Sequence, residues 1–202
     1  MKKLLLTVIC LAVALGASAK FRWGPVVTAD FSHYHWHQRL ISNKMLVGGG
    51  VGVIGEVMIP GIGFGFDFGL KYMNHGGQVG FDEQYIWSSE GIGKTNLRMS
   101  VIQIPVNVRF KYTRLNGVEN VVAPFVYGGP EFNLNVGNAH CEAVRRETVS
   151  VALGCGLGAE LYKRYQVSGG YYWDMTDDMK TRKLDNFTAR LQGWRVNFAV
   201  LF

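Results

Sequence analysis

The segment His33-Tyr34-His35-Trp36-His37 has residue types and a spacing that could bind a metal ion. Alternate residues of an extended chain lie on one face, so two of these imidazoles could meet one ion. A zinc-type site needs three or four ligands in a set geometry, and the sequence offers no second cluster of ligands. We therefore expect no metal site. We interpret the segment as the place where a strand reaches the membrane interface, with Tyr34 and Trp36 near the lipid headgroups.

Other residues with reactive side chains give weaker patterns. Asp30, Ser32 and His33 could be arranged as an acid, a nucleophile and a base, but any chain of this length contains such neighbours. The glycine-rich runs at 48–55 and 154–158 lack the Lys-Ser/Thr ending and the following helix of a phosphate-binding loop. We therefore expect no catalytic site, no cofactor and no enzyme.

The first nineteen residues have the three-part pattern of a secretory signal. Lys2 and Lys3 precede an apolar stretch over 4–15, and Ala17-Ser18-Ala19 forms a small-residue cleavage site. The apolar stretch is too short for a transmembrane helix, which needs about 20 residues. We expect a cleaved signal peptide at 1–19 and one mature domain at 20–202. Its formal net charge falls from +6 to +4 on cleavage, which is too low to indicate nucleic-acid binding.

Apolar residues of the mature chain recur at every second position, which is the period of a β-strand. Short and long connections alternate between the segments, as in outer-membrane barrels. The long connections fall near 33–45, 74–97, 137–148 and 176–187. The pattern predicts an eight-stranded antiparallel up-and-down transmembrane β-barrel, with both termini on the short-turn, periplasmic side. We expect its strands near 21–32, 46–59, 62–73, 98–112, 121–136, 149–162, 165–175 and 188–202.

Glycine distinguishes a membrane barrel from a soluble one. The interior of an eight-stranded barrel is only wide enough for packed side chains, so the glycine-rich face should point inward. The charged face has twelve strand glycines, whereas the apolar face has few, such as Gly49, Gly55, Gly128 and Gly169. We therefore expect the large apolar residues to face lipid. The glycines of the charged face are Gly48, Gly50, Gly52, Gly63, Gly65, Gly69, Gly129, Gly154, Gly156, Gly158, Gly170 and Gly193.

The same alternation predicts a polar network inside the barrel. Its charges nearly cancel, which favours paired side chains because an isolated charge in a narrow lumen is costly. The charged residues expected there are Arg22, Asp30, Glu56, Asp67, Lys71, Arg109, Lys111, Glu131, Glu160, Asp174 and Arg195. Further hydrogen bonds are expected from Gln103, Asn107, Asn133, Asn135, Gln166, Tyr172 and Asn197.

The C-terminus and the cysteines give two further expectations. The last strand alternates up to a terminal phenylalanine and resembles the signal by which the barrel assembly machinery recognises its substrates. Its residues are Trp194, Val196, Phe198, Val200 and Phe202. We expect Cys141 to be a free thiol in an outer loop and Cys155 to be a small apolar side chain on the lipid face.

Two strand motifs cover part of the mature chain. One is Ile104-Pro105-Val106 followed by Arg109-Phe110-Lys111-Tyr112, and the other is Ala123-Pro124-Phe125 with Gly128-Gly129-Pro130. They resemble motifs of the PorT-like outer-membrane barrel family, and the similarity extends through 154–160 and 168–173, so it covers nearly the whole mature chain. The resemblance implies an outer-membrane barrel. Phe125 and Tyr171-Tyr172-Trp173 depart from the commoner forms, so we do not extend the founding member's secretion role to this chain.

Rigid scaffolds usually bind through their loops. We therefore expect a non-enzymatic barrel that presents outer loops for interaction, the loop near 74–97 in particular. The alternatives are a small-solute, porin-like channel and a lipid-modifying enzyme. The expected partners are outer-membrane lipid, the barrel assembly machinery and an extracellular or envelope protein.

Overall fold

The computed structural model describes the backbone of most of residues 20–202. The described residues are 20–36, 41–59, 61–81, 94–112, 120–136, 144–146, 148–176, 179–181 and 188–202. The proposed signal peptide at 1–19 lies outside them. Within these ranges, no helix is long and apolar enough to cross a membrane.

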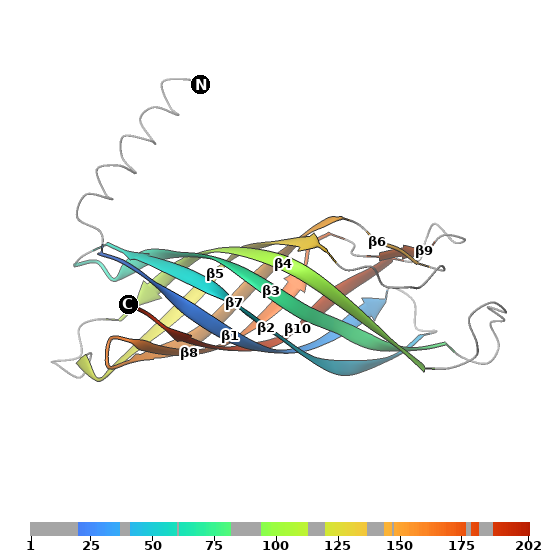
Figure 1. Cartoon of the computed structure of the whole chain (residues 1–202), viewed down its shortest axis with the longest axis horizontal. Coiled ribbons are helices and arrows are strands. Elements are labelled where there is room, and N and C mark those ends of the chain that lie inside the picture. The colour runs from blue at the N-terminus through green and yellow to red at the C-terminus, as the bar shows by residue number, and fades with distance from the viewer. Residues whose placement is uncertain are drawn as a thin grey trace, which may run out of the picture.

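Eight of the ten strands form a closed antiparallel barrel (Figure 1). Around the barrel the strands pair in the order β1, β2, β3, β4, β5, β7, β8 and β10, and the pairing of β1 with β10 closes the ring. The short strands β6 and β9 pair with each other, and β9 also pairs with β10. This closed barrel confirms the predicted fold class. The strands are β1 (Lys20–Trp36), β2 (Ile41–Met58), β3 (Phe64–Phe81), β4 (Lys94–Lys111), β5 (Val122–Asn135), β6 (Val144–Arg146), β7 (Val149–Leu161), β8 (Tyr165–Asp174), β9 (Met179–Thr181) and β10 (Thr188–Val200).

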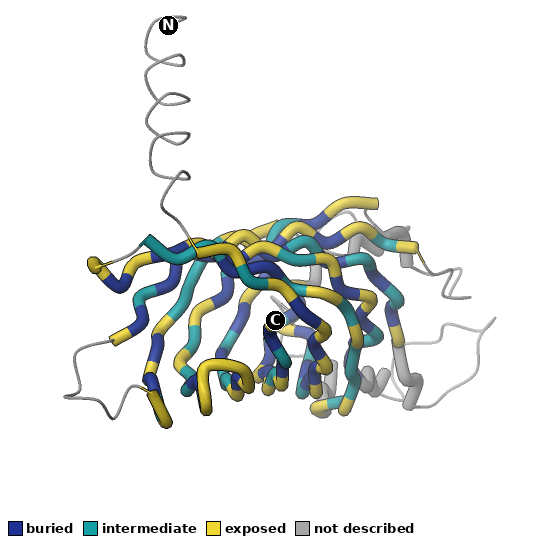
Figure 2. Tube along the Cα trace, turned by 60° about the vertical axis from the view of Figure 1, so that its left-hand side comes forward, coloured by how far each residue is buried: buried dark blue, intermediate teal, exposed yellow. Residues whose placement is uncertain are grey.

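Burial alternates along each strand, as Figure 2 shows for the whole barrel. In β3, the side chains of Phe66 and Leu70 are about half exposed, at 50% and 51%, whereas Asp67 and Lys71 are 6% and 7% exposed. A surface of large apolar side chains around a charged interior is stable in lipid and unstable in water. The alternation of the sequence therefore corresponds to an apolar exterior and a polar lumen.

Inward-facing glycines make room for large side chains of the neighbouring strand. A Cβ atom at Gly154 of β7 would lie 2.8 Å from Oε1 of Glu131, and one at Gly156 would lie 2.6 Å from the hydroxyl of Tyr127. Contacts this short do not occur in proteins, so a larger residue would displace these β5 side chains. In contrast, a Cβ atom at the outward-facing Gly169 would meet nothing within 4 Å. The glycine-rich face is thus the crowded, inner one.

The first four strands are longer than the sequence pattern predicts. The connections expected near 33–45 and 74–97 are partly strand, because β1 extends to Trp36 and β2 begins at Ile41, while β3 extends to Phe81 and β4 begins at Lys94. In these extensions the backbone pairing continues, but the apolar alternation ends. Asn74 and Ser100, for example, are paired residues of β3 and β4, and the Asn74 side chain donates to the Ser100 hydroxyl at 3.4 Å. A strand in water can carry polar side chains on both faces, so the alternation of apolar and polar residues that predicts a strand is absent from these extensions. Residues 82–93 lie outside the described residues.

Both ends of the barrel chain lie at the short-turn end (Figure 1). The turn after β2 uses glycines with positive φ, 83° at Gly61 and 78° at Gly63, a conformation that favours glycine. At the same end, the amide of Phe202 donates to the carbonyl of Trp23 at 2.9 Å, and the amide of Trp23 donates back at 3.3 Å. The last residue of the chain therefore joins the barrel wall next to the start of β1.

Candidate functional site

The lower lumen, near the short-turn end, is organised around the carboxylate of Glu56. This side chain is 1% exposed and accepts four hydrogen bonds. Oε1 accepts from Arg22 Nη2 at 2.6 Å and from Lys111 Nζ at 2.8 Å. Oε2 accepts from Arg109 Nη1 and Gln166 Nε2, both at 2.6 Å. A carboxylate has about four acceptor positions, so those of Glu56 are filled.

Glu160 shares most of these donors. Its Oε2 accepts from Arg22 Nη2 at 2.6 Å, Lys111 Nζ at 2.7 Å and Gln166 Nε2 at 2.9 Å. Arg22 also donates to the carbonyl of Lys163 at 2.7 Å, which ties β1 to the turn after β7. Two carboxylates thus hold the same two cations across the lumen.

Arg109 connects this group to Asp67. Its Nε donates to Asp67 Oδ2 at 2.7 Å, and its guanidinium lies 4.0 Å from the centre of the Phe125 ring. We call the six charged residues the lower cluster: Arg22, Glu56, Asp67, Arg109, Lys111 and Glu160. Its three cations balance its three carboxylates, so removal of any one partner would leave an uncompensated charge in the lumen.

A second group of polar residues surrounds Arg195 of β10. Arg195 donates from Nη1 to Glu131 Oε2 at 2.7 Å and from Nε to Asp30 Oδ1 at 3.2 Å. Its guanidinium also lies 4.2 Å from the ring centre of Tyr172, whose hydroxyl donates to Asp30 Oδ2 at 3.0 Å. Gln103 accepts from Arg195 at 3.2 Å and donates to Glu131 at 3.0 Å. We call these five residues the upper cluster: Asp30, Gln103, Glu131, Tyr172 and Arg195.

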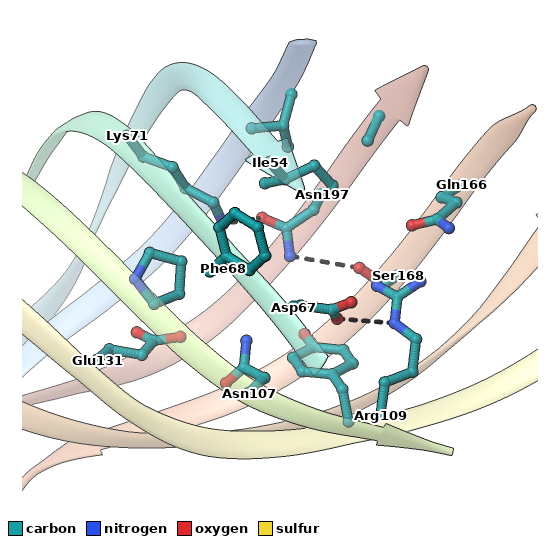
Figure 3. A pocket seen from close by; sticks show the side chains of 14 residues that line it. Ile54, Asp67, Phe68, Lys71, Asn107, Arg109, Glu131, Gln166, Ser168 and Asn197 are labelled. Carbon is teal, nitrogen blue, oxygen red and sulfur yellow. Dashed lines mark hydrogen bonds and ion pairs between the residues drawn. The ribbon is translucent and has the colours of Figure 1, made fainter. Parts of the chain in front are cut away.

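A small cavity separates the two clusters (Figure 3). Its volume is about 50 Å³, which is room for a few water molecules. Lys71 lines it and donates to Asn197 Oδ1 at 3.3 Å. Asp67 Oδ1 and Asn107 Oδ1 are buried there without a protein partner, which makes the cavity polar enough to hold water.

An apolar layer closes the lumen above the upper cluster. Met73, Met99 and Leu191 are at most 1% exposed, and the Tyr34 hydroxyl lies 3.1 Å from the Met99 sulfur. The position expected for Tyr34 at the lipid headgroups is therefore wrong, because its side chain is completely buried in the lumen. The sequence pattern gave no sign of this layer, since Tyr34 and Met73 lie in segments expected to be loop or strand end.

The short-turn end of the lumen is open. A vestibule of about 590 Å³ is lined there by Arg22, Glu56, Lys111 and Glu160 together with apolar residues such as Met58. The lower cluster forms its floor. Among the described residues, the lumen thus runs from an open vestibule to the lower cluster, a small cavity, the upper cluster and the apolar layer.

The structure separates the residues considered for catalysis. Asp30 and Ser32 face the lumen, and the Ser32 hydroxyl donates to the carbonyl of Gly76 at 2.7 Å. His33 faces outward, so it cannot act as the base for Ser32. No group of three or more His, Cys, Asp or Glu side chains within the described ranges could hold a metal ion. His37 lies outside these ranges.

The remaining candidate residues are found in three places. Asp174 is buried in the lumen at the end of β8. The residues of the proposed assembly signal are on the outer face of β10, with Phe202 64% exposed. Cys155 is exposed on the outer face of β7 and is free, whereas Cys141 lies outside the described residues.

Comparison with solved structures returns other outer-membrane barrels. The outer membrane protein OprG of Pseudomonas aeruginosa matches with a TM-score of 0.53 and 11% identity, over 92% of this chain and 96% of that one. Neisserial surface protein A matches with a TM-score of 0.45 and 13% identity, over 88% and 97%. Ail, the attachment invasion locus protein of Yersinia pestis, matches with a TM-score of 0.47 and 12% identity, over 91% and 99%. At these identities the likeness shows the fold alone.

Comparison with protein families extends this result to the sequence. No curated protein matches the chain. Residues 4–197 match the outer membrane protein beta-barrel domain, which covers almost the whole sequence. The chain therefore belongs to the outer membrane protein beta-barrel domain family, and its place is the bacterial outer membrane.

Proposed function

We propose that this protein is a closed scaffold that anchors outward-facing segments for interaction and does not conduct solutes as an open porin does. The observation that carries this proposal is the filled lumen. A permeating solute would have to separate the ion pairs of Glu56, displace Arg195 from Glu131 and then pass the apolar layer at Met99. The interior of an eight-stranded barrel is just wide enough for such side chains, whereas water-filled porins have about 16 strands.

The long strands supply the scaffold's outer platform. On one side of the barrel, β1 to β4 are 17 or 18 residues long, whereas β8 on the other side has 10. The longer strands continue beyond the apolar band and bring Trp36, Ile41, Phe81 and Lys94 to the outer end of the sheet. A rigid sheet restricts the segments that it connects, which lowers the entropy lost when a partner binds.

Three finer parts of this proposal concern export, partners and subfamily. We propose that 1–19 is a cleaved signal peptide, that the barrel assembly machinery inserts the chain, and that the outer segments bind an extracellular or envelope protein. We also propose membership of the PorT-like subfamily. In support, its motif residues Arg109 and Lys111 supply two of the three cations that bind Glu56.

Planar-bilayer recording tests the closed lumen. The purified, refolded barrel should give no stable porin-sized conductance under conditions where a 16-stranded porin conducts. Reproducible large single-channel steps from the unmutated protein would refute the scaffold and support the channel. Cross-linking and affinity purification from intact cells would then identify the protein bound to the outer segments.

A further inference from the structure

The vestibule at the short-turn end has more cations than carboxylates in its wall. Both of its carboxylates, Glu56 and Glu160, already accept four hydrogen bonds each, so neither has a free acceptor position. Four cations face these two carboxylates, which leaves a surplus of two positive charges. The cations among the described lining residues are Lys20, Arg22, Lys111 and Lys163.

The surplus charge is on Lys20 and Lys163. Both residues are exposed, and neither ammonium group has a hydrogen bond or an ion pair with another described residue. Lys111 supplies a further donor, because its ammonium group has three hydrogens and donates two bonds, to Glu56 and Glu160. The vestibule thus offers two free cations at its mouth and one unused N–H group at its floor.

Arg22 brings the two free cations close together. Lys20 and Arg22 are two residues apart in β1, so their side chains lie on the same face of the strand. Arg22 Nη1 donates to the carbonyl of Lys163 at 2.7 Å, and the turn that contains Lys163 lies at the same end of the barrel as the start of β1 (Figure 1). Lys20 and Lys163 are therefore on the same side of the vestibule.

The turn between β7 and β8 holds Lys163 in an unfavourable backbone conformation. The amide of Arg164 donates to the carbonyl of Leu161 at 3.1 Å, and the two central residues of this turn, Tyr162 and Lys163, have φ of 51° and 57°. Asparagine and glycine are favoured at such positions, because a side chain is crowded there. Lysine at this position lowers the stability of the turn. Unfavourable conformations of this kind cluster at ligand-binding sites.

The other part of the vestibule wall is apolar. Met58, Ile59 and Ala123 line it between the lysines at the mouth and the lower cluster at the floor. The volume of about 590 Å³ is within the range of pockets that bind small organic molecules. A bare inorganic anion would leave the apolar wall without contacts, so the lining favours a ligand that has a carbon chain.

We propose that the vestibule binds an organic dianion in which two acidic groups are joined by a short apolar chain. Lys20 and Lys163 bind one acidic group, and the unused N–H of Lys111 binds the other. In the expected orientation, the vestibule opens to the periplasm. A vestibule that ends at the lower cluster is compatible with a closed lumen, so failure of this proposal would leave the proposed function intact.

The test is an NMR titration of the isotope-labelled, refolded barrel in nonionic detergent micelles, where both ends of the lumen are accessible. The probes are adipate, a dicarboxylate with an apolar chain, its monomethyl ester, and sulfate, a dianion without a carbon chain. Lys20→Gln and Lys163→Gln each remove one free cation. Lys163→Gly removes the same charge and relieves the turn. Arg164→Gln is the matched control, because it removes the adjacent positive charge, which does not line the vestibule.

We expect adipate to shift the amide signals of Arg22 and of residues 162–164 and to leave that of Trp36, at the outer end, unchanged. Lys20→Gln and Lys163→Gln should each raise the dissociation constant of adipate about fivefold, the upper end for an ion pair between exposed groups. Lys163→Gly should weaken binding as much as Lys163→Gln. Retained heat-modifiable migration in gels establishes that each variant is folded.

Arg164→Gln should leave adipate binding unchanged. Absence of adipate-dependent shifts at residues 162–164 would overturn the proposal. The same holds for binding that neither lysine variant weakens, or that Arg164→Gln weakens as much as Lys163→Gln does. Equally tight binding of sulfate or of the monomethyl ester would overturn the assignment to an organic dianion.

Discussion

Replacing Glu56 by glutamine should strongly destabilise the barrel. The substitution keeps the size of the side chain but removes the charge that faces Arg22, Arg109 and Lys111. The lower cluster would then hold three cations and two carboxylates. In addition, the new NH₂ group would point its hydrogens at donors that now bind one of the carboxylate oxygens.

The structure gives the expected size of this effect. Each oxygen of Glu56 accepts two bonds, so the amide loses two bonds from charged or amide donors and weakens the others. A hydrogen bond to a charged group contributes about 1.5–3 kcal/mol, and breaking a buried ion pair costs about 3–5 kcal/mol. We therefore expect Glu56→Gln to lower the free energy of unfolding by about 3–5 kcal/mol.

Urea unfolding in lipid vesicles, followed by the gel shift between folded and heated protein, measures this free energy. The double variant Glu56→Gln with Lys111→Gln restores the charge balance, so it should recover about 1–3 kcal/mol relative to the sum of the single effects. Arg190→Gln on the outer face is a control and should change stability by less than about 0.5 kcal/mol. A Glu56→Gln protein as stable as the unmutated one, or strictly additive effects in the double variant, would refute the network.

Two further predictions concern the outer face. Leu157 is exposed near the middle of the apolar band on β7, so Leu157→Lys should lower the free energy of unfolding by about 2–4 kcal/mol. Val149→Lys, at the outer end of the same strand, should lower it by about 0–1 kcal/mol. Equal effects of the two variants on unfolding in vesicles would show that the apolar band has been placed at the wrong height on the barrel. Phe202→Ala keeps the backbone pairing with Trp23 and removes the exposed ring, so it should lower the amount of protein in the outer membrane without lowering the stability of refolded protein. Unchanged amounts of folded protein in membrane fractions would argue against an assembly signal.

The alternation of the sequence was sufficient to predict the barrel and the two faces of its wall. Side chains of an extended chain point to opposite sides in turn, so the face of each residue is a local property. Phe66 and Asp67 illustrate this, since they are neighbours in β3 and lie in opposite environments. The excess of glycine on one face then indicated which face is the lumen, because only a crowded interior requires residues without a side chain.

Strand ends were less predictable where the strands leave the membrane. At Asn74 and Ser100, polar side chains occupy the outer face while backbone pairing continues. Water is compatible with polar residues on both faces of a strand, so alternation no longer marks the element. Tyr34 illustrates the consequence. The segment that contains it lacks the alternation and was expected to be a connection, so its side chain could not be assigned to the lumen.

The sequence determined the fold, the approximate strands and the balance of charge on one face, because these depend on side-chain direction and on composition. Only the tertiary structure decided which charges meet. Glu56 binds Arg109 and Gln166, which are 53 and 110 residues away in the chain, and the contact depends on the tilt and register of strands that close into a ring. The apolar layer has the same origin, since Tyr34 of β1 and Met99 of β4 meet only when the closed ring brings these strands to face each other across the lumen.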